Sequence, residues 1–319
     1  MKLKLIALAA MLAAGSAHAA IDSGLLNLDP NTTGNGELML NLKWKDTNLA
    51  DGNQSVSATF DLGITMNDAV ANFNTPGYSR SWNLNSYGSA FANFLNAVGS
   101  NIGNAEMNVI AFDGTGTDPG DTRLLSTTAG INATGTTLSL AASSIPTNGN
   151  YNAIFGNVTV VNFMVAVNNS ASHNSVANGA SNADASSGFA LFGDTMDKFG
   201  GLSAFDSTNK FDGSYAAGTG VLSGQAKALP FYLVTASDND PFHKASMTPF
   251  GFDVDGDGVI EFDNNGATAG GTSEYGLWTL QGGTLTYSVA AVPEAETYAM
   301  MLAGLGLVGF MVRRRRHAI

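Results

Sequence analysis

Short segments in which apolar and polar residues alternate limit the possible folds of this chain more than any other feature. In 38–44 and 56–62 every second residue is apolar, and the stretch 48–53 between them carries turn-forming Asn, Asp and Gly. Side chains of a strand face the same side of a sheet at every second position, whereas a helix repeats every 3.6 residues. These two segments therefore predict half-buried strands joined as a hairpin.

Further strands are predicted at 82–84, 107–112, 138–140 and 229–233, and as a hairpin formed by 277–280 and 284–289 around Gln281-Gly282-Gly283. Segment 107–112 is apolar on both faces, which indicates cover on both sides. Pro230 has no backbone N–H to donate, so its strand is expected at an edge or a bulge. The chain is therefore predicted to be mainly β, an antiparallel β-sandwich with a few short helices.

Helical periodicity is rare. Residues 91–98 place four aromatic or aliphatic side chains, Phe91, Phe94, Leu95 and Val98, on one face and are followed by a glycine, and 189–199 form a second apolar stripe. Segment 158–167 fits either a buried strand or a helix. The tract 168–188 is rich in Asn, Ser, Ala and Gly without periodicity, which predicts a long loop or linker and a possible subdivision of the body, 20–290.

Composition excludes several classes of protein. The chain has no cysteine, so disulfides and thiol chemistry are excluded. Lys and Arg number 14 against 26 Asp and Glu, and six of the cations lie in the terminal segments. A mature chain that lacks these six cations and is cut just after Glu296 has a net charge of −18. This charge repels nucleic acid and anionic lipid, and it suits either divalent cations, a charged matrix or solubility alone.

The N-terminal segment 1–19 has the order of a secretory signal peptide. Two lysines precede an apolar core, and small residues follow up to Ala17 and Ala19. Cleavage is expected between Ala19 and Ala20.

The C-terminal apolar run 298–312 ends at four basic residues, Arg313, Arg314, Arg315 and Arg316. As a helix it would cover about 22 Å, which is shorter than the ~30 Å hydrocarbon core, but snorkelling side chains and a thinned bilayer make up the difference. We expect a transmembrane helix with the basic stop, 313–316, in the cytoplasm and the body outside the inner membrane.

The residues Val292, Pro293 and Glu294, together with the apolar run and the arginines, resemble the PEP-CTERM sorting tail of exosortase substrates. The resemblance covers 292–319 alone. It implies processing near the Pro-Glu junction by an exosortase-type membrane enzyme, in a Gram-negative bacterium of the kind that produces exopolysaccharide. The chain departs from the family pattern at Ala295, which replaces the usual second proline.

One motif has the chemistry of a metal site. The sequence 253–258 reads D-x-D-x-D-G, in which alternate carboxylates converge in a tight loop and the glycine permits the turn. Calcium takes six to eight oxygen ligands of this kind. The loop resembles EF-hand and dockerin-like calcium sites, although Asn264 stands where the final bidentate Glu is expected, and the alternative is a metal-free acidic turn. The predicted ligands are Asp253, Asp255, Asp257, Val259, Glu261 and Asp263.

The other groups of residues that could form a catalytic or binding site have weak support in the sequence. His173 and His243 have no zinc-ligand spacing, and no G-x-S-x-G occurs. Asp238, Asp240 and His243 share one loop, for which a polar turn is favoured over a site. Five aromatic residues could stack on sugars or pack in the core, with core packing the commoner role: Tyr78, Trp82, Tyr87, Tyr275 and Trp278.

These features predict an exported, non-enzymatic protein of the cell surface or the exopolysaccharide matrix, with a structural or adhesive role and one stabilising Ca²⁺. The alternatives are a carbohydrate-binding module and a secreted glycan hydrolase with paired carboxylates. The expected partners are the exosortase-type enzyme, the inner membrane and exopolysaccharide, and not nucleic acid.

Overall fold

The computed structural model describes residues 21–26, 34–44, 56–87, 90–98, 106–115, 119–127, 147–152, 155, 161, 164–165, 167–168, 182–184, 215–216, 228–252, 274–291, 303–305 and 307–308. The strands are β1 (Glu37–Trp44), β2 (Val56–Thr65), β3 (Ser79–Asn83), β4 (Glu106–Gly114), β5 (Thr122–Thr127), β6 (Asn182–Asp184), β7 (Tyr215–Ala216), β8 (Ala228–Thr235), β9 (Ser246–Pro249), β10 (Leu277–Gln281) and β11 (Thr284–Ser288). The helices are α2 (Met66–Asn72), α3 (Ala90–Val98) and α4 (Asn148–Asn152), with 3-10 turns η2 (Leu84–Ser86) and η4 (Pro119–Asp121).

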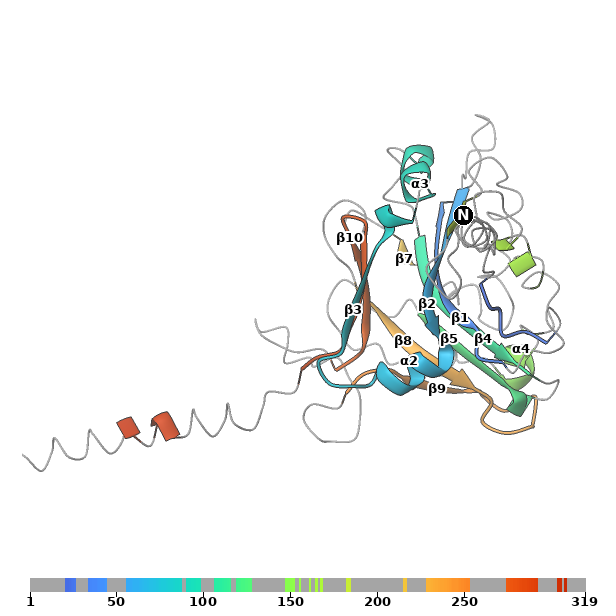
Figure 1. Cartoon of the computed structure of the whole chain (residues 1–319). Coiled ribbons are helices and arrows are strands. Elements are labelled where there is room, and N and C mark those ends of the chain that lie inside the picture. The colour runs from blue at the N-terminus through green and yellow to red at the C-terminus, as the bar shows by residue number, and fades with distance from the viewer. Residues whose placement is uncertain are drawn as a thin grey trace, which may run out of the picture.

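The strands form one sheet in the order β3–β11–β10–β8–β5–β4–β1–β2–β6, with β7 beside β4 and β9 beside β8. Every strand pair in the described part of the chain is antiparallel. The sheet bends at β8, and β3, β10 and β11 lie across from β1 and β2 (Figure 1). The indole Nε1 of Trp82 in β3 donates to the Leu62 carbonyl in β2, over 2.8 Å. The predicted class, mainly β and antiparallel with few helices, is confirmed.

Strand β8 connects the two parts of the sheet. Its residues Phe231–Thr235 pair with β5, whereas Ala228–Pro230 pair with β10. The prediction that Pro230 places this strand at an edge is therefore wrong, because β8 is central. The ladder with β5 begins at Phe231, one residue after the proline, so that ladder does not require the missing N–H.

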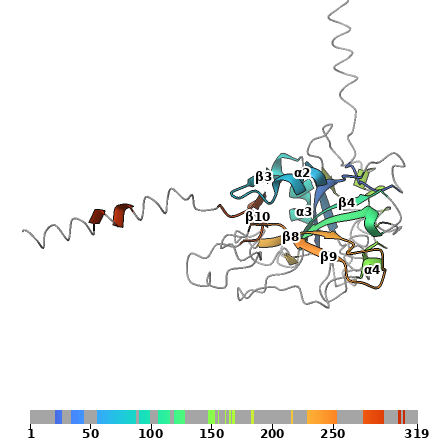
Figure 2. The same cartoon turned by 90° about the horizontal axis from the view of Figure 1, so that it is seen from below.

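An apolar core lies between the two parts of the sheet. It contains Leu40, Phe60, Phe231, Trp278 and Tyr287, each no more than 1% exposed. Helix α3 covers one end of this core (Figures 1 and 2) and buries Phe91, Phe94 and Val98, as their helical spacing predicts. The opposite face of the main sheet is also covered, because Ile110 and Phe112 of β4 are both fully buried. This confirms that the segment 107–112 is enclosed on both sides.

The two predicted hairpins are present. β1 pairs with β2, and β10 pairs with β11 through a turn in which Gly282 and Gly283 have φ of 56° and 80°. Two consecutive residues with positive φ are typical of the type I′ turn that matches the twist of the strands. The 82–84 strand ends at Asn83, because Leu84 begins a 3-10 turn. Segment 158–167 is helical where it is described, at 161, 164–165 and 167.

Several predictions fall on residues outside those described, among them the strand at 138–140, the helix at 189–199, the signal peptide and most of the tract 168–188. In the tail, residues 303–305 and 307–308 are helical. No helix within the described ranges is long and apolar enough to cross a membrane.

Candidate functional site

The end of the body is fixed to the sheet up to the residue at which the tail begins. Val289 donates its backbone N–H to the Tyr78 carbonyl over 2.9 Å, and the Gly77 N–H donates to the Ala290 carbonyl over 2.9 Å. Val289 is also buried, with 5% of its surface exposed. Ala291 is the first exposed residue after β11. The chain is therefore held by the turn before β3 as far as Ala290.

Strand β11, which leads to this junction, is anchored in the core. The Tyr287 ring stacks on Phe73 with centroids 4.1 Å apart, and its hydroxyl donates to the Phe73 carbonyl over 2.9 Å. Burial raises the pKa of Tyr287, so the phenol stays protonated and remains a donor. Leu285 and Tyr287 are both fully buried between β3 and β10. The junction is thus the end of an inner strand.

The predicted sorting residues lie just beyond this point. Val292, Pro293, Glu294 and the four arginines, Arg313 to Arg316, are outside the described residues, as are Ala17, Ala19 and Ala20 of the predicted leader cleavage site. The structure places their neighbours: Ala291 precedes Val292, and Ile21 follows Ala20. Ile21 is 1% exposed, and its N–H and carbonyl bond to the side-chain amide of Asn168 over 2.9 and 3.1 Å.

The acidic loop is carried on a short hairpin stem. Strand β9 continues to Phe250, whose N–H donates to the Phe231 carbonyl, and the chain returns at Gly276, whose N–H donates to the Phe250 carbonyl over 2.7 Å. Phe252 and Glu274 are joined by a backbone bond of 2.8 Å, and Gly251 bridges to Tyr275. The two ends of the segment 253–273, at Phe252 and Glu274, are therefore held side by side after β9 and before β10. The predicted ligands, Asp253, Asp255, Asp257, Val259, Glu261 and Asp263, lie outside the described residues.

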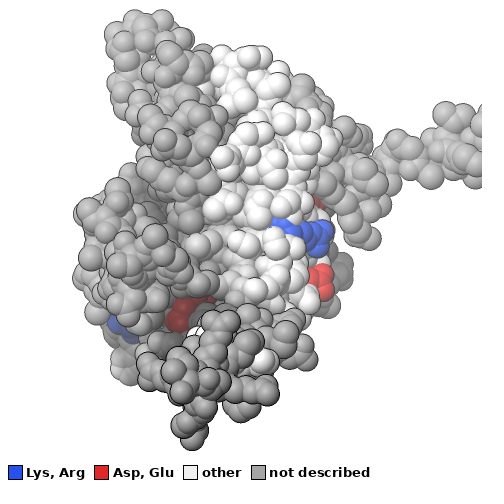
Figure 3. Space-filling view, turned by 90° about the vertical axis from the view of Figure 1, so that its left-hand side faces the viewer, with Lys and Arg blue, Asp and Glu red and all other residues white. Residues whose placement is uncertain are grey.

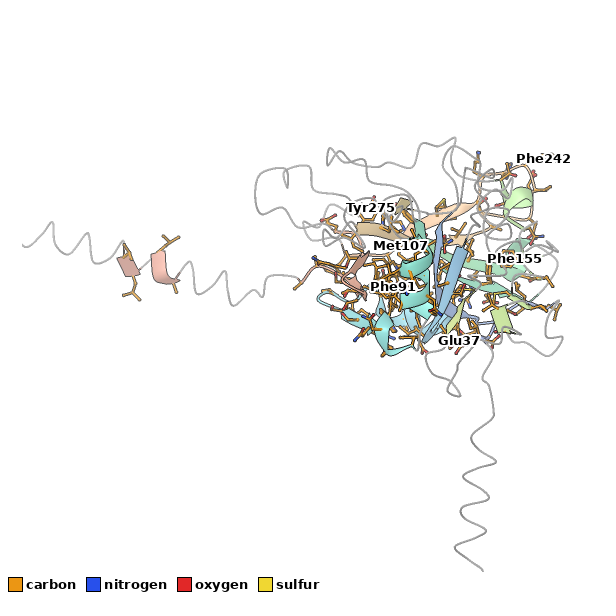
Figure 4. All side chains as sticks on the ribbon, turned by 90° about the horizontal axis from the view of Figure 1, so that it is seen from above. Glu37, Phe91, Met107, Phe155, Phe242 and Tyr275 are labelled. Atoms are coloured by element: carbon orange, nitrogen blue, oxygen red, sulfur yellow. The ribbon has the colours of Figure 1, made fainter. Side chains whose placement is uncertain are left out.

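The loop that contains Asp238, Asp240 and His243 is a polar turn, as favoured from the sequence. The Asn148 side chain fills its centre: its Nδ2 donates to Asp238 Oδ1 over 2.9 Å, and its Oδ1 accepts from the Ser237 N–H over 3.1 Å. His243 Nδ1 lies 2.5 Å from Asp238 Oδ2, which raises the pKa of His243 and lowers that of Asp238. No group of metal-ligating side chains assembles among the described residues. At the tip, Phe242 is 85% exposed (Figure 4).

The aromatic residues proposed as sugar platforms are part of the core. Trp82, Tyr87, Tyr275 and Trp278 are each no more than 8% exposed, and Tyr78 packs partly buried against the core. Trp82 and Trp278 lie with ring centroids 5.4 Å apart. A stack on sugar needs an exposed ring face, so four of these rings cannot supply one in this structure.

The outer face of β3, β11 and β10 presents small polar side chains instead. Side chains alternate across each strand, so the buried set faces the core and the other set faces outward. Ser81, Thr286 and Thr279 form the middle row, in which the Ser81 and Thr286 hydroxyls are 2.8 Å apart. The flanking rows contain Ser79, Ser288, Leu277, Asn83, Thr284 and Gln281. None of these nine residues is ionisable, and the described surface on this side is mostly uncharged (Figure 3). The alternation of residues in the sequence predicts which side chains of each strand face outward. Which of these side chains lie next to one another on neighbouring strands depends on the strand register, which the sequence does not show.

Comparison with known proteins identifies the tail alone. The family model described as "PEP-CTERM protein-sorting motif" matches residues 291–316. No curated protein and no solved structure matches the chain. The match begins at Ala291, the residue after Ala290, whose carbonyl accepts from the Gly77 N–H, so the folded body and the motif meet at Ala290 and Ala291. The chain therefore ends in a PEP-CTERM protein-sorting motif, which implies an exported protein that an exosortase sorts in a Gram-negative bacterium.

Proposed function

We propose that this protein is a non-enzymatic structural or adhesive component of the cell surface or the exopolysaccharide matrix, to which exosortase processing delivers it. The observation that carries the proposal is the direct junction of a packed β body with the sorting motif at residues 290–291. Because the sorting motif follows the packed body directly, sorting of the motif also delivers this body as a folded unit. The acidic mature chain, with a charge of −18, suits a hydrated location that is rich in polysaccharide and divalent cations.

The proposal includes one calcium ion in the loop 253–263. The backbone bonds between Phe250 and Gly276 and between Phe252 and Glu274 support it, because they bring together the two ends of the longer segment 253–273, which contains the predicted ligands. A metal that binds a loop closed in this way has less chain entropy to offset. The ligands would be the carboxylates of the D-x-D-x-D-G sequence, the Val259 carbonyl and the carboxylates of Glu261 and Asp263.

The first test is the intact mass of the protein in inner-membrane, periplasmic, surface and culture fractions of its host. The expected result is a mature chain that begins at Ala20, ends near Glu294 and occurs in the outer fractions. A chain that retains Arg313 to Arg316 and stays in the inner membrane would contradict the surface role and indicate a permanently anchored periplasmic protein.

A second candidate function is carbohydrate binding by the outer face of β3, β11 and β10. The rows of hydroxyl and amide side chains favour it, since these groups both donate and accept hydrogen bonds, as sugars require. Binding is measured by the retardation of the protein in gels that contain the polysaccharide of the host. Thr286→Arg, in the middle row, should abolish the retardation, whereas the matched change Thr248→Arg on β9 should not. Equal retardation of the two variants would contradict this candidate.

The glycan-hydrolase alternative makes a different prediction for the same polysaccharide. A hydrolase would release reducing ends over time, whereas a structural or binding protein would leave their number constant. A time course of reducing ends with the purified mature protein separates these functions. Steady release that depends on an acidic residue would contradict the non-enzymatic proposal.

A further inference from the structure

The number of residues between the sheet and the processing site limits where the processing enzyme can lie. Ala290 is the last residue that a described backbone bond holds to the body, and Glu294 is four residues further. A fully extended chain spans at most about 3.3–3.6 Å per residue, so the Pro-Glu junction lies within roughly 14 Å of Ala290. An α-helix with its side chains is about 10–12 Å thick. An enzyme that encloses this junction must therefore reach the surface of the body.

Unpairing of β11 would lengthen the tether, but the packing opposes it. β11 lies between β3 and β10, and its Leu285 and Tyr287 side chains are fully buried. Withdrawal of the strand would break the Tyr287–Phe73 stack and hydrogen bond and expose both side chains. Full burial of such side chains contributes roughly 1.5–3 kcal/mol each. The chain therefore stays fixed at Ala290 while the tail is processed.

The surface around this point is an exposed turn that we call the junction turn, residues 74–77. Hydrogen bonds hold it to the body: the Thr75 N–H donates to the Asn72 carbonyl over 3.0 Å, the Tyr78 N–H donates to the Thr75 carbonyl over 2.9 Å, and Asn74 Oδ1 accepts from the Gly251 N–H. The Gly77 N–H makes the bond to Ala290 itself. The junction turn is thus attached to the residue from which the tail departs.

The absence of charge on the junction turn also suits a position near the membrane. Its four residues, Asn-Thr-Pro-Gly, are all exposed and none is ionisable, in a mature chain whose net charge is −18. Anionic lipid repels an acidic surface, so the part of an acidic protein nearest the membrane is best uncharged. The predicted membrane segment begins eight residues after Ala290, within roughly 29 Å.

We propose that the junction turn, together with Ala290 and Ala291, is the docking surface on which the body contacts the membrane-bound processing enzyme. The inference rests on exosortase sorting as the proposed route of this chain. It adds that the enzyme contacts the folded body as well as the tail, at a defined turn remote in sequence from the motif. Loop residue Phe242 lies at the opposite end of the body from β3 and serves as a reference (Figures 1 and 4).

The test uses the full chain, expressed in its host with a photo-crosslinking residue in place of Thr75 or, as the control, of Phe242. Both side chains are exposed. Thr75 should form an adduct with the membrane enzyme at a yield at least several-fold above that of Phe242. Insertion of about 12 Gly/Ser residues between Ala290 and Ala291 makes a flexible tether of roughly 20 Å, and it should reduce the Thr75 adduct several-fold.

A pair of matched charge variants gives an independent measurement. Thr75→Glu should slow the appearance of the processed mass several-fold, whereas Thr284→Glu, at the other end of β11, should leave it unchanged. If the tail is processed but residues 75 and 242 give equal yields of adduct, or no adduct, the proposed docking surface is wrong. Exosortase sorting would still hold in that case. Absence of any processed mass in the unmodified chain would overturn both.

Discussion

Close contact between a glycine and a tyrosine fixes the end of β10 and β11. A Cβ added to Gly276 would lie 1.8 Å from the Tyr287 hydroxyl oxygen. That hydroxyl cannot move away without loss of its bond to the Phe73 carbonyl, and the ring is stacked on Phe73. Gly276 therefore permits the acidic hairpin to return to the sheet directly beside a buried phenol.

Gly276→Ala should destabilise the mature protein by about 3 kcal/mol, near the upper part of the range for overpacked cores. The measurement is urea unfolding followed by tryptophan fluorescence. Gly120→Ala is the control, because its Cβ would meet Asn239 at an ordinary 3.4 Å. A loss of similar size in both variants would show that the Tyr287 contact is not the cause.

Glu37 gives the protein a pH dependence at its N-terminal segment. Burial raises the pKa of Glu37 above its usual 4.5, the Asp22 N–H bond opposes this shift, and the Asp22 charge adds to it. The folded state therefore holds this proton more tightly than the unfolded state does. The stability that Glu37 contributes is fully present below pH 4.5 and is lost as the pH rises through the higher folded pKa.

Glu37→Gln removes this titration and keeps an oxygen that can accept the Asp22 N–H bond of 2.8 Å. The variant should raise the melting temperature at pH 7 and have little effect at pH 4. Asp121→Asn, at an exposed site, controls for the general loss of one negative charge from an acidic chain. An equal rise at both pH values would contradict the raised pKa.

At the scale of elements, local patterns were sufficient where both partners are adjacent in sequence. The β10–β11 hairpin follows from alternation and two glycines, and α3 follows from the spacing of Phe91, Phe94 and Val98. β5 could not be predicted, because Leu124, Leu125 and Ser126 are all buried on a strand covered on both faces, which removes the alternation. Helix α2 also gave no apolar stripe, since only Met66 and Ala69 are buried.

Features that depend on pairing between residues far apart in the sequence could not be predicted from the sequence. The hydrogen bond between Gly77 and Ala290 joins a turn to the far end of the chain, and no local property of either residue indicates it. The central position of β8 is likewise set by β5 and β10, not by Pro230. The sorting motif was predictable because it is a contiguous signal, whereas the surface next to it is not.

The predicted calcium site in the loop 253–263 gives a prediction at the scale of elements. If calcium closes the loop 253–263 on its stem, EGTA should lower the melting temperature of the mature protein. A ligand at 100 times its Kd stabilises by about 2.7 kcal/mol. Differential scanning calorimetry with and without calcium measures the effect. Asp255→Ala should remove the response, and the exposed-site variant Asp121→Ala should retain it. An unmodified protein that melts at one temperature in both buffers would contradict the metal site.

At the scale of the whole molecule, the body is tied to its own sheet near both ends of the mature chain. Ala290 is bonded to Gly77 at one end, and the Ile21 backbone is bonded to Asn168 at the other. The first described residue, Ile21, is the second after the expected leader cleavage, and it is 1% exposed. If the expected leader is removed after Ala19, the mature chain has a buried residue, Ile21, at its second position, and the sorting tail follows a strand whose Leu285 and Tyr287 side chains are fully buried.

The hydrogen bonds between the Ile21 backbone and Asn168 lead to a prediction about both folding and maturation. Asn168→Ala removes a donor and an acceptor at once and leaves the Ile21 N–H and carbonyl without those partners. Unpaired buried groups cost about 1–3 kcal/mol each, so the variant should lose about 2 kcal/mol in urea unfolding. Asn168→Asp, which keeps the acceptor for the Ile21 N–H, should lose less. Intact mass should still place the mature terminus at Ala20 in both variants, because the signal peptide is recognised before folding. Equal stability of all three proteins would mean that Asn168 does not hold the mature terminus in solution.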